Sequence, residues 1–272
     1  MSLKIGDVSK LLSMSPETIR YYESEKIISP TRNKDSKYRR YEPWDIFHLM
    51  DCKRNRSLGL SIKDLTYLAT GGGSVDYIAL KVKEQEQKIQ KELQYNFLLQ
   101  TKLNQIRTLI ETIAINQGNY WYSKTQEQLC YVCFNSDFDQ YDDLDDVGPL
   151  FSKWLEYLPF VDFSISLERV GSLDNIRCDW LYTIEKEYAE ILRIPIDDTV
   201  TVIPSHLSLN TVIDIGEKGN FSLDQLDAIN RYIDKSEYKI CGKIIGKLIA
   251  RINDGDGFHR YLYMEIPVSA KK

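Results

Sequence analysis

The chain has 272 residues, of which 43% are hydrophobic and 28% are charged, and its formal net charge is −5. This composition is that of a globular protein, and the acidic average argues against a simple basic nucleic-acid binder. With no run near 18 apolar residues and no apolar leader at the start, we expect a cytoplasmic protein with no membrane partner. Five scattered cysteines in so long a chain argue against a disulfide framework.

Residues 1–73 carry the signals of several short helices. Apolar residues at helical spacing predict a first helix over residues 5–12. Ser15-Pro16-Glu17 predicts the start of a second, with a hydroxyl cap, a proline in the first turn and an acid near the positive end of the dipole. A third helix is predicted from Pro43 to Leu58. Ser61 and Asp64 have the spacing of a capping box and begin a fourth.

Residues 74–117 predict one long helix, because Ser74 can cap it and neither glycine nor proline follows until residue 118. At about 1.5 Å per residue it would reach roughly 60 Å, too long for one compact domain. Read in sevens, it has a seam that is apolar in its second half, which favours a coiled coil in a homodimer. The alternative is a single helix packed on its own C-terminal domain. The expected dimerisation residues are Ile89, Asn96, Leu99, Leu103, Ile106 and Ile110.

Residues 118–272 alternate between strand-like runs and amphipathic helices. One set comprises a strand at 129–134, a helix at 150–158 and strands at 162–167 and 179–184. A second set comprises a strand at 208–215, a helix at 222–233 and strands at 243–252 and 259–268. The order β-α-β-β therefore occurs twice, which predicts a duplicated α+β unit with its helices on one side of an antiparallel sheet.

The charge is unevenly distributed among these segments. The balance of basic over acidic residues is +4 in residues 1–73, +1 in residues 74–117 and −10 in residues 118–272. The acidic average therefore belongs mostly to the C-terminal segment and does not count against DNA binding by the N-terminal one.

Three sequence blocks give the N-terminal segment a family resemblance. They are Lys4-Ile5-Gly6-Asp7-Val8-Ser9-Lys10-Leu11-Leu12, Ser15-Pro16-Glu17-Thr18-Ile19-Arg20-Tyr21-Tyr22-Glu23 and Tyr38-Arg39-Arg40-Tyr41. Over residues 3–70 the chain resembles the MerR family of transcriptional regulators. The resemblance implies a winged helix-turn-helix over residues 1–73 that binds double-stranded promoter DNA, and an antiparallel dimerisation coiled coil over residues 74–117. More loosely, residues 118–272 resemble the effector-binding domain of the multidrug-sensing, BmrR-like branch.

The second helix is then the expected recognition helix. Thr18 and Arg20 project from its first turns toward base edges, and arginine suits guanine. The other predicted contacts donate to phosphates, which positions the protein without reading the sequence. Core packing is the alternative for Tyr22 and Tyr41, and a solvated face is the alternative for the basic end of the third helix. The predicted DNA-binding residues are Ser15, Thr18, Arg20, Tyr21, Tyr22, Tyr38, Arg39, Arg40, Tyr41, Arg54 and Arg56.

The last predicted strand has one polar and one apolar face. Tyr261, Tyr263 and Glu265 alternate with Leu262, Met264 and Ile266. The apolar face should take the helix, and the polar face should line a pocket. A carboxylate beside aromatic rings favours a small organic ligand, in particular a lipophilic cation, with exposure of Glu265 at the sheet rim as the alternative. The predicted ligand-binding residues are Glu265, Tyr263, Tyr261, Trp180, Tyr182 and Glu187.

Other functions are disfavoured by the same sequence. Cys130 and Cys133 form a C-x-x-C pair, but in a strand, positions three apart point to opposite faces, and no second pair completes a metal site. We therefore expect neither a metal nor a cofactor, although a metal- or stress-sensing regulator and a ligand-independent repressor remain as alternatives. With three histidines and no nucleophile elbow or phosphate loop, no catalytic set stands out, and we expect no enzyme.

The family resemblance also implies a mechanism. A homodimer sits on a promoter whose recognition elements are spaced too widely for RNA polymerase. Binding of the effector changes the shape of the dimer and distorts the DNA, so the polymerase is an indirect partner. The long helix connects the DNA-binding segment with the effector-binding segment, and we expect it to transmit the change from one to the other.

Overall fold

The structure, a computed structural model, describes residues 2–33, 37–137, 140–141, 148–169, 176–217 and 221–271. The chain divides into two compact units, Met1–Tyr95 and Asn96–Lys272. The boundary lies inside the helix α5 (Val75–Asn116), whose 42 residues confirm the long helix predicted from the sequence. No helix within the described ranges is both long enough and apolar enough to cross a membrane.

The N-terminal unit is helical, with one small hairpin. Its elements are α1 (Ile5–Leu12), α2 (Pro16–Ser24), β1 (Thr31–Arg32), β2 (Arg39–Arg40), α3 (Pro43–Ser57) and α4 (Ile62–Ala69). All four predicted helices are confirmed. Part of the polar stretch before Tyr38, residues 34–36, lies outside the described residues.

Side-chain caps explain where two of these helices begin. The Ser15 hydroxyl accepts the amide N–H of Thr18 at 3.1 Å, and Pro16 needs no partner in the first turn. At α4 the capping box is complete, since the Asp64 carboxylate accepts the Ser61 N–H at 2.7 Å and the Ser61 hydroxyl accepts the Asp64 N–H at 3.2 Å. The hairpin pairs Thr31 with Arg40 and is joined to the N-terminus by hydrogen bonds between Leu3 and Tyr41.

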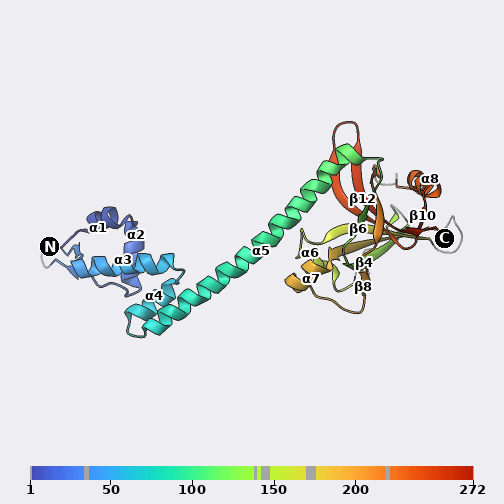
Figure 1. Ribbon diagram of the computed structural model, residues 1–272. Helices are drawn as coiled ribbons and strands as arrows, with labels where there is room; N and C mark the ends of the chain where they lie inside the picture. Colours follow the sequence, from blue (N-terminus) through green and yellow to red (C-terminus); the bar gives the residue numbers. More distant parts are fainter. Residues whose placement is uncertain are drawn as a thin grey trace. The chain divides into compact units, whose positions relative to one another are not determined.

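The C-terminal unit is built on one large antiparallel sheet (Figure 1). Its strands are β3 (Trp121–Lys124), β4 (Gln128–Asp137), β5 (Gln140–Tyr141), β6 (Asp162–Arg169), β7 (Ile176–Glu185), β8 (Val200–Ile203), β9 (Leu207–Asp214), β10 (Tyr238–Ile240), β11 (Ile244–Asn253) and β12 (Phe258–Ala270). The order is β3-β9-β12-β11-β6-β7-β4-β5, with β10 on β12 and β8 on β4. The helices are α6 (Phe151–Leu155), α7 (Lys186–Leu192), the 3-10 turn η2 (Leu223–Leu226) and α8 (Asp227–Lys235).

In chain order, a strand, a helix and two strands follow one another as β4-α6-β6-β7 and as β9-α8-β11-β12, with β5 and β10 interposed. The duplication of one unit stays a prediction. Each set also carries elements that the sequence did not predict: α7 and β8 after the first, and β10 within the second. The helix predicted over 150–158 is shorter than expected, because Pro159 follows and the chain turns after Leu155.

One face of the sheet is apolar and carries α6 and α8. Met264 of β12 and Ile229 of α8 are buried in one hydrophobic cluster, and Trp154 of α6 packs with Tyr182 in a second. Trp180 of β7 belongs to the first cluster, and it lies two residues from Tyr182 on the same face. Both helices therefore cover the same side of the sheet, as the alternation in the last strand predicted.

The opposite face of the sheet is polar and buried. Its side chains include Gln128 on β4, Ser164 on β6, Thr183 on β7 and Asn210 on β9, all at most 2% exposed. The second half of α5 packs against this unit, since Leu98 and Leu99 contact the second hydrophobic cluster. The polar side chains of this face lie on the side of the sheet where α5 lines a cavity.

The packing of α5 changes the interpretation of the predicted seam. Leu99 packs on the core of its own C-terminal unit and Ile106 lines a cavity there, so both residues already have contacts within the chain. Leu103 and Ile110 are exposed on this chain. The heptad reading placed both sets in one seam, whereas the second half of the helix has one face on its own domain and another uncovered.

Candidate DNA interface and ligand pocket

Helix α2 presents an exposed polar face. Arg20 and Tyr21 are exposed, and Thr18 is half-buried with its hydroxyl 3.0 Å from that of Ser15. Ile19 lies in the core of the unit, so the register of the helix is determined by packing. The exposed residues are therefore held on a fixed helix, which suits the reading of a DNA groove.

Two of the predicted DNA contacts are corrected by their burial. Tyr22 and Tyr41 lie in the hydrophobic core of the N-terminal unit, and Tyr41 is 0% exposed. Aromatic rings contribute large apolar surfaces to a core, and these two rings pack with Ile19 and Leu49 in the same cluster. Their role is core packing, the alternative that the sequence left open.

The predicted basic contacts are partly engaged within the chain. The Arg39 guanidinium donates to the Glu23 carboxylate at 2.6 Å, and this bond raises the pKa of Arg39. Arg56 donates to the carbonyl of Leu60 at 2.5 Å. Arg40 is half-buried, whereas Tyr38 and Arg54 are exposed. Arg39 therefore positions the hairpin against α2, and the exposed side chains among the predicted contacts that lie within the described ranges include those of Arg20, Tyr21, Tyr38 and Arg54.

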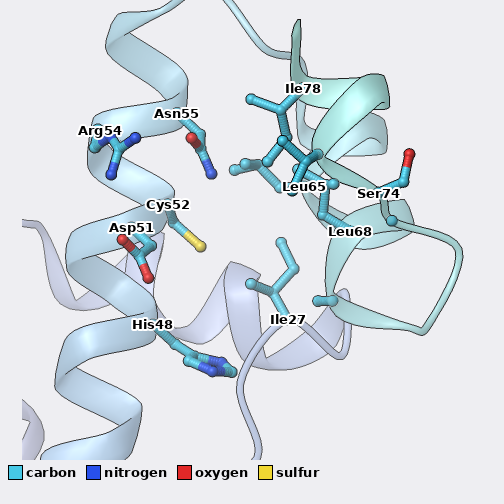
Figure 2. A pocket seen from close by; sticks show the side chains of 13 residues that line it. Ile27, His48, Asp51, Cys52, Arg54, Asn55, Leu65, Leu68, Ser74 and Ile78 are labelled. Atoms are coloured by element: carbon cyan, nitrogen blue, oxygen red, sulfur yellow. The ribbon is translucent and has the colours of Figure 1, made fainter.

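A pocket of about 450 Å³ lies in the N-terminal unit between α3, α4 and the start of α5 (Figure 2). Ile27, Leu65 and Ile78 provide apolar walls, and Arg54 lines it from α3. The Cys52 thiol points into this space, and burial raises its pKa to about 11, so it is protonated at neutral pH. His48 and Asp51 also line the pocket, from the same helix as Cys52 and Arg54.

A second cavity, of about 350 Å³, lies in the C-terminal unit between α5 and the polar face of the sheet. Two of the predicted ligand residues, Glu265 and Tyr263, line it. Burial raises the pKa of Tyr263 to about 12, which keeps its hydroxyl neutral. The lining residues are Lys102, Asn104, Gln105, Ile106, Thr108, Leu109, Asp162, Glu185, Lys247, Tyr263 and Glu265.

Glu265 is only 6% exposed, which excludes the solvent-exposed rim position. Its carboxylate accepts hydrogen bonds from the Lys247 ammonium at 2.9 Å and the Gln128 amide at 2.8 Å. Burial alone would lower the pKa of Lys247, but the surrounding carboxylates of Glu265, Asp162 and Glu185 raise it. Glu265 is therefore one half of a buried ion pair and not a free counter-ion.

Two further carboxylates change the charge of the cavity. Asp162 accepts both of its bonds from the Lys102 ammonium, at 2.8 and 3.0 Å. The side chain of Glu185 forms no hydrogen bond or ion pair with any residue that the structure describes, and burial raises its pKa. With two lysines and three carboxylates the cavity carries one net negative charge when all are ionised, which favours a cation.

The other predicted ligand residues lie elsewhere. Trp180 and Tyr182 line a different pocket, on the helix-covered face with Phe151 and Phe163. Tyr261 stacks on His259, and Glu187 is exposed outside the cavity. Trp180 and Tyr182 were grouped with Glu265 because both strands alternate. Alternation along one strand does not tell on which side of the sheet each face of a distant strand lies. The register of the strands places Trp180 and Tyr182 on the opposite side of the sheet from Glu265.

Sequence reasoning missed Lys102, Asp162, Glu185 and Lys247 as site residues. The alternation of Lys247 with apolar neighbours in β11 was a usable signal for a lysine facing the same side as Tyr263, with which it is paired. Lys102 had a weaker signal, as a lysine beside the apolar seam of a helix.

The cysteine pair does not form a metal site. Cys130 and Cys133 are both buried, and burial raises the pKa of Cys130 and brings that of Cys133 to about 12. Within the described ranges, no group of three or more histidine, cysteine, aspartate or glutamate side chains is arranged to hold a metal ion.

Comparison with known proteins bears on the N-terminal segment. Residues 4–41 match the sequence model of the MerR family regulatory proteins. This part of the N-terminal segment is therefore similar to the MerR family of regulatory proteins. An uncharacterized HTH-type transcriptional regulator of Pseudomonas aeruginosa is 35% identical over 68 residues, 25% of this chain and 52% of that protein. The heavy metal-dependent transcription regulator 2 of Rhizobium meliloti is 34% identical over 95 residues, 32% of this chain and 65% of that protein.

The chain spans about half to two thirds of the length of these two curated relatives. Among solved structures, the cryo-EM structure of an EcmrR–DNA complex covers 99% of this chain and 100% of that chain, at 17% identity and a TM-score of 0.39. Both the family model and the two curated relatives describe regulatory proteins, the class of protein that the sequence predicted.

Proposed function

We propose that this chain binds promoter DNA as a homodimer and distorts it when an organic cation binds the C-terminal unit. The observation that carries this proposal is a cavity, covered by α5 itself, whose lining includes three carboxylates and two lysines. A ligand in that cavity meets the same helix that continues into the N-terminal unit. Only a ligand that binds the activating conformation more tightly can shift the equilibrium.

The division of labour follows the three segments: residues 1–73 for DNA, 74–117 for dimerisation and 118–272 for the effector. The exposed donors of Arg20, Tyr21, Tyr38 and Arg54 support the first assignment. The exposed Leu103 and Ile110 support the second. The repeated β-α-β-β order supports a duplicated effector domain whose two halves enclose the site. RNA polymerase remains an indirect partner, which responds to the distorted promoter.

The test uses the full chain on its own promoter region. Footprinting and calorimetry are carried out with benzyltrimethylammonium as the cationic probe, and Glu265→Gln is compared with the parent. We expect the cation to bind the parent, to change the footprint and to bind Glu265→Gln more weakly. An unchanged affinity in Glu265→Gln would remove this residue from the site, and an unchanged footprint at saturation would favour a ligand-independent repressor.

Metal sensing is the second candidate, because the Rhizobium meliloti relative is named a heavy metal-dependent regulator. Against it, the two clustered thiols are buried with raised pKa values, and a metal needs thiolates. We expect zinc and copper to leave the footprint unchanged. A metal response that is lost in the Cys130→Ser/Cys133→Ser double variant would reverse this ranking.

A further inference from the structure

Lys102 is the one lysine of α5 that is buried in the described structure, at 4% exposed. Burying an ammonium is costly unless a partner compensates it. Here the compensation comes from Asp162 at the start of β6, whose two oxygens lie 2.8 and 3.0 Å from the Lys102 nitrogen. The preceding turn of the helix packs on the domain through Leu98 and Leu99. The ammonium of Lys102 is therefore inserted into the cavity wall from the helix that covers it.

The cavity has the composition of a site for a hydrogen-bonding cation. Around Lys102 lie the carboxylates of Asp162, Glu185 and Glu265 and the hydroxyl of Thr108, whereas Tyr263 is the one aromatic side chain among the lining residues described. A quaternary cation needs aromatic faces, because it has no N–H to donate. A primary ammonium donates three hydrogen bonds, and carboxylates accept them.

We infer that the effector is a protonated primary amine whose ammonium replaces that of Lys102 at Asp162, and that the release of Lys102 passes the binding signal to α5. This inference rests on the proposed function. Lys102 competes with the effector for Asp162. While the Lys102 ammonium is paired with Asp162, α5 is linked to β6. The effector binds Asp162 only when that ion pair breaks. Glu185, which lines the same cavity and has no hydrogen-bond or ion-pair partner among the described residues, accepts the remaining N–H groups.

The direct test removes the competitor from the full chain. Lys102→Met keeps the length of the side chain and deletes its charge. We expect 1,5-diaminopentane to bind this variant about tenfold more tightly than the parent, because no fraction of the sites is occupied by Lys102. The variant's promoter footprint should match that of the ligand-saturated parent and no longer respond to the diamine. Calorimetry and footprinting measure the two effects.

Matched controls separate displacement from a general change of charge. Arg107→Met deletes a positive charge from the same helix at an exposed ion pair with Glu111, and it should behave as the parent does. The bis-quaternary cation pentane-1,5-bis(trimethylammonium) has the same chain and the same two charges as the diamine but no N–H, so it reports the electrostatic effect alone. Replacement of Lys102 predicts a larger gain in affinity for the diamine than for this quaternary cation, whereas a purely electrostatic effect raises the two affinities equally. If Lys102→Met does not fold, as judged by its thermal melt, Lys102→Gln takes its place.

The outcomes distinguish the inference from the function on which it rests. Equal gains for the diamine and the bis-quaternary cation, or equal diamine affinity in parent and Lys102→Met, overturn the displacement. Binding of benzyltrimethylammonium without binding of the diamine overturns the amine class and leaves the proposed function standing. If neither cation binds the full chain or alters its footprint, both fail.

Discussion

Arg20 is the exposed arginine of α2, and it tests the DNA interface at the level of a single residue. Replacing it with alanine should weaken promoter binding by about 1–3 kcal/mol, since a bidentate arginine–guanine contact contributes that much to discrimination. Fluorescence anisotropy with the promoter fragment measures the change. Lys83→Ala removes the same charge from an exposed position of α5 and should leave the affinity within about twofold of the parent. Equal losses in both variants would mean that Arg20 contributes only net charge.

The hydroxyl of Tyr41 allows a test of its core position. It is buried and has no hydrogen-bond partner among the described residues. Because an unsatisfied buried hydroxyl costs free energy, Tyr41→Phe should leave the free energy of unfolding unchanged or raise it by up to about 1 kcal/mol. DNA affinity should not change, whereas Tyr38→Phe, at a side chain that is 74% exposed, should lower it. A loss of DNA affinity in Tyr41→Phe would restore its predicted phosphate contact.

Local patterns predicted which residues share a face but not which faces meet. Glu265 and Tyr263 were placed together correctly because they lie two residues apart in one strand. Their partners are remote in sequence: Lys247 is 18 residues from Glu265, and Asp162 is 60 residues from Lys102. Whether such carboxylates are neutralised depends on strand register, which the fold determines as a whole.

At the scale of an element, the exposed side of α5 leads to a testable prediction about the dimer. Leu103 and Ile110 should form the dimer interface, so the Leu103→Lys/Ile110→Lys double variant should sediment as a monomer where the parent is a dimer. The matched control is Leu99→Ala, at a residue that packs on its own domain. It should lower the stability of the C-terminal unit by about 1–2 kcal/mol and leave the dimer intact. Dissociation of the Leu99→Ala dimer would mean that Leu99 contributes to the dimer interface.

Elements with strong local signals were predicted well, and those that depend on tertiary contacts were not. The caps at Ser15 and Ser61 placed α2 and α4 within a residue, because the capping bonds are local. The short strands β3, β8 and β10 have three to four residues of weak alternation and exist through pairing with β9, β4 and β12. Helix α5 was predicted from the long run of sequence without glycine or proline. The packing of its second half is determined by contacts with its own C-terminal unit and does not follow the heptad pattern.

At the scale of the whole molecule, the distribution of charge agrees with the two proposed roles. The N-terminal segment has a balance of +4 and the C-terminal one −10. Under the proposed function, a basic DNA-binding segment gains from phosphate attraction, and an acidic effector segment is repelled by DNA while it attracts cations. The formal net charge of −5 is the sum of these unequal segments and the balance of +1 in residues 74–117.

The pH dependence of unfolding depends on an ion pair at one end of the sheet. His259 of β12 contacts the Asp214 carboxylate at 2.5 Å, and Asp254 lies 3.4 Å from its other nitrogen. The hydrogen bond to Asp214 raises the pKa of His259 above its ordinary 6.5. Burial alone would raise the pKa of Asp214, but hydrogen bonds from His259, Gly216 and Arg260 lower it below 3.8.

The raised pKa of His259 stabilises the fold fully below pH 6.5, and that contribution is lost as the pH rises through the folded value. The lowered pKa of Asp214 stabilises above pH 3.8 and is lost as the pH falls through the folded value. The pair therefore contributes most between these two limits. His259→Gln should lower Tm more at about pH 5.5 than at about pH 8.5, and His48→Gln, at a histidine that forms no ion pair in the described ranges, should show no such difference. A Tm loss in His259→Gln that is equal at both pH values would mean that the contact with Asp214 stabilises as a neutral hydrogen bond and not as an ion pair.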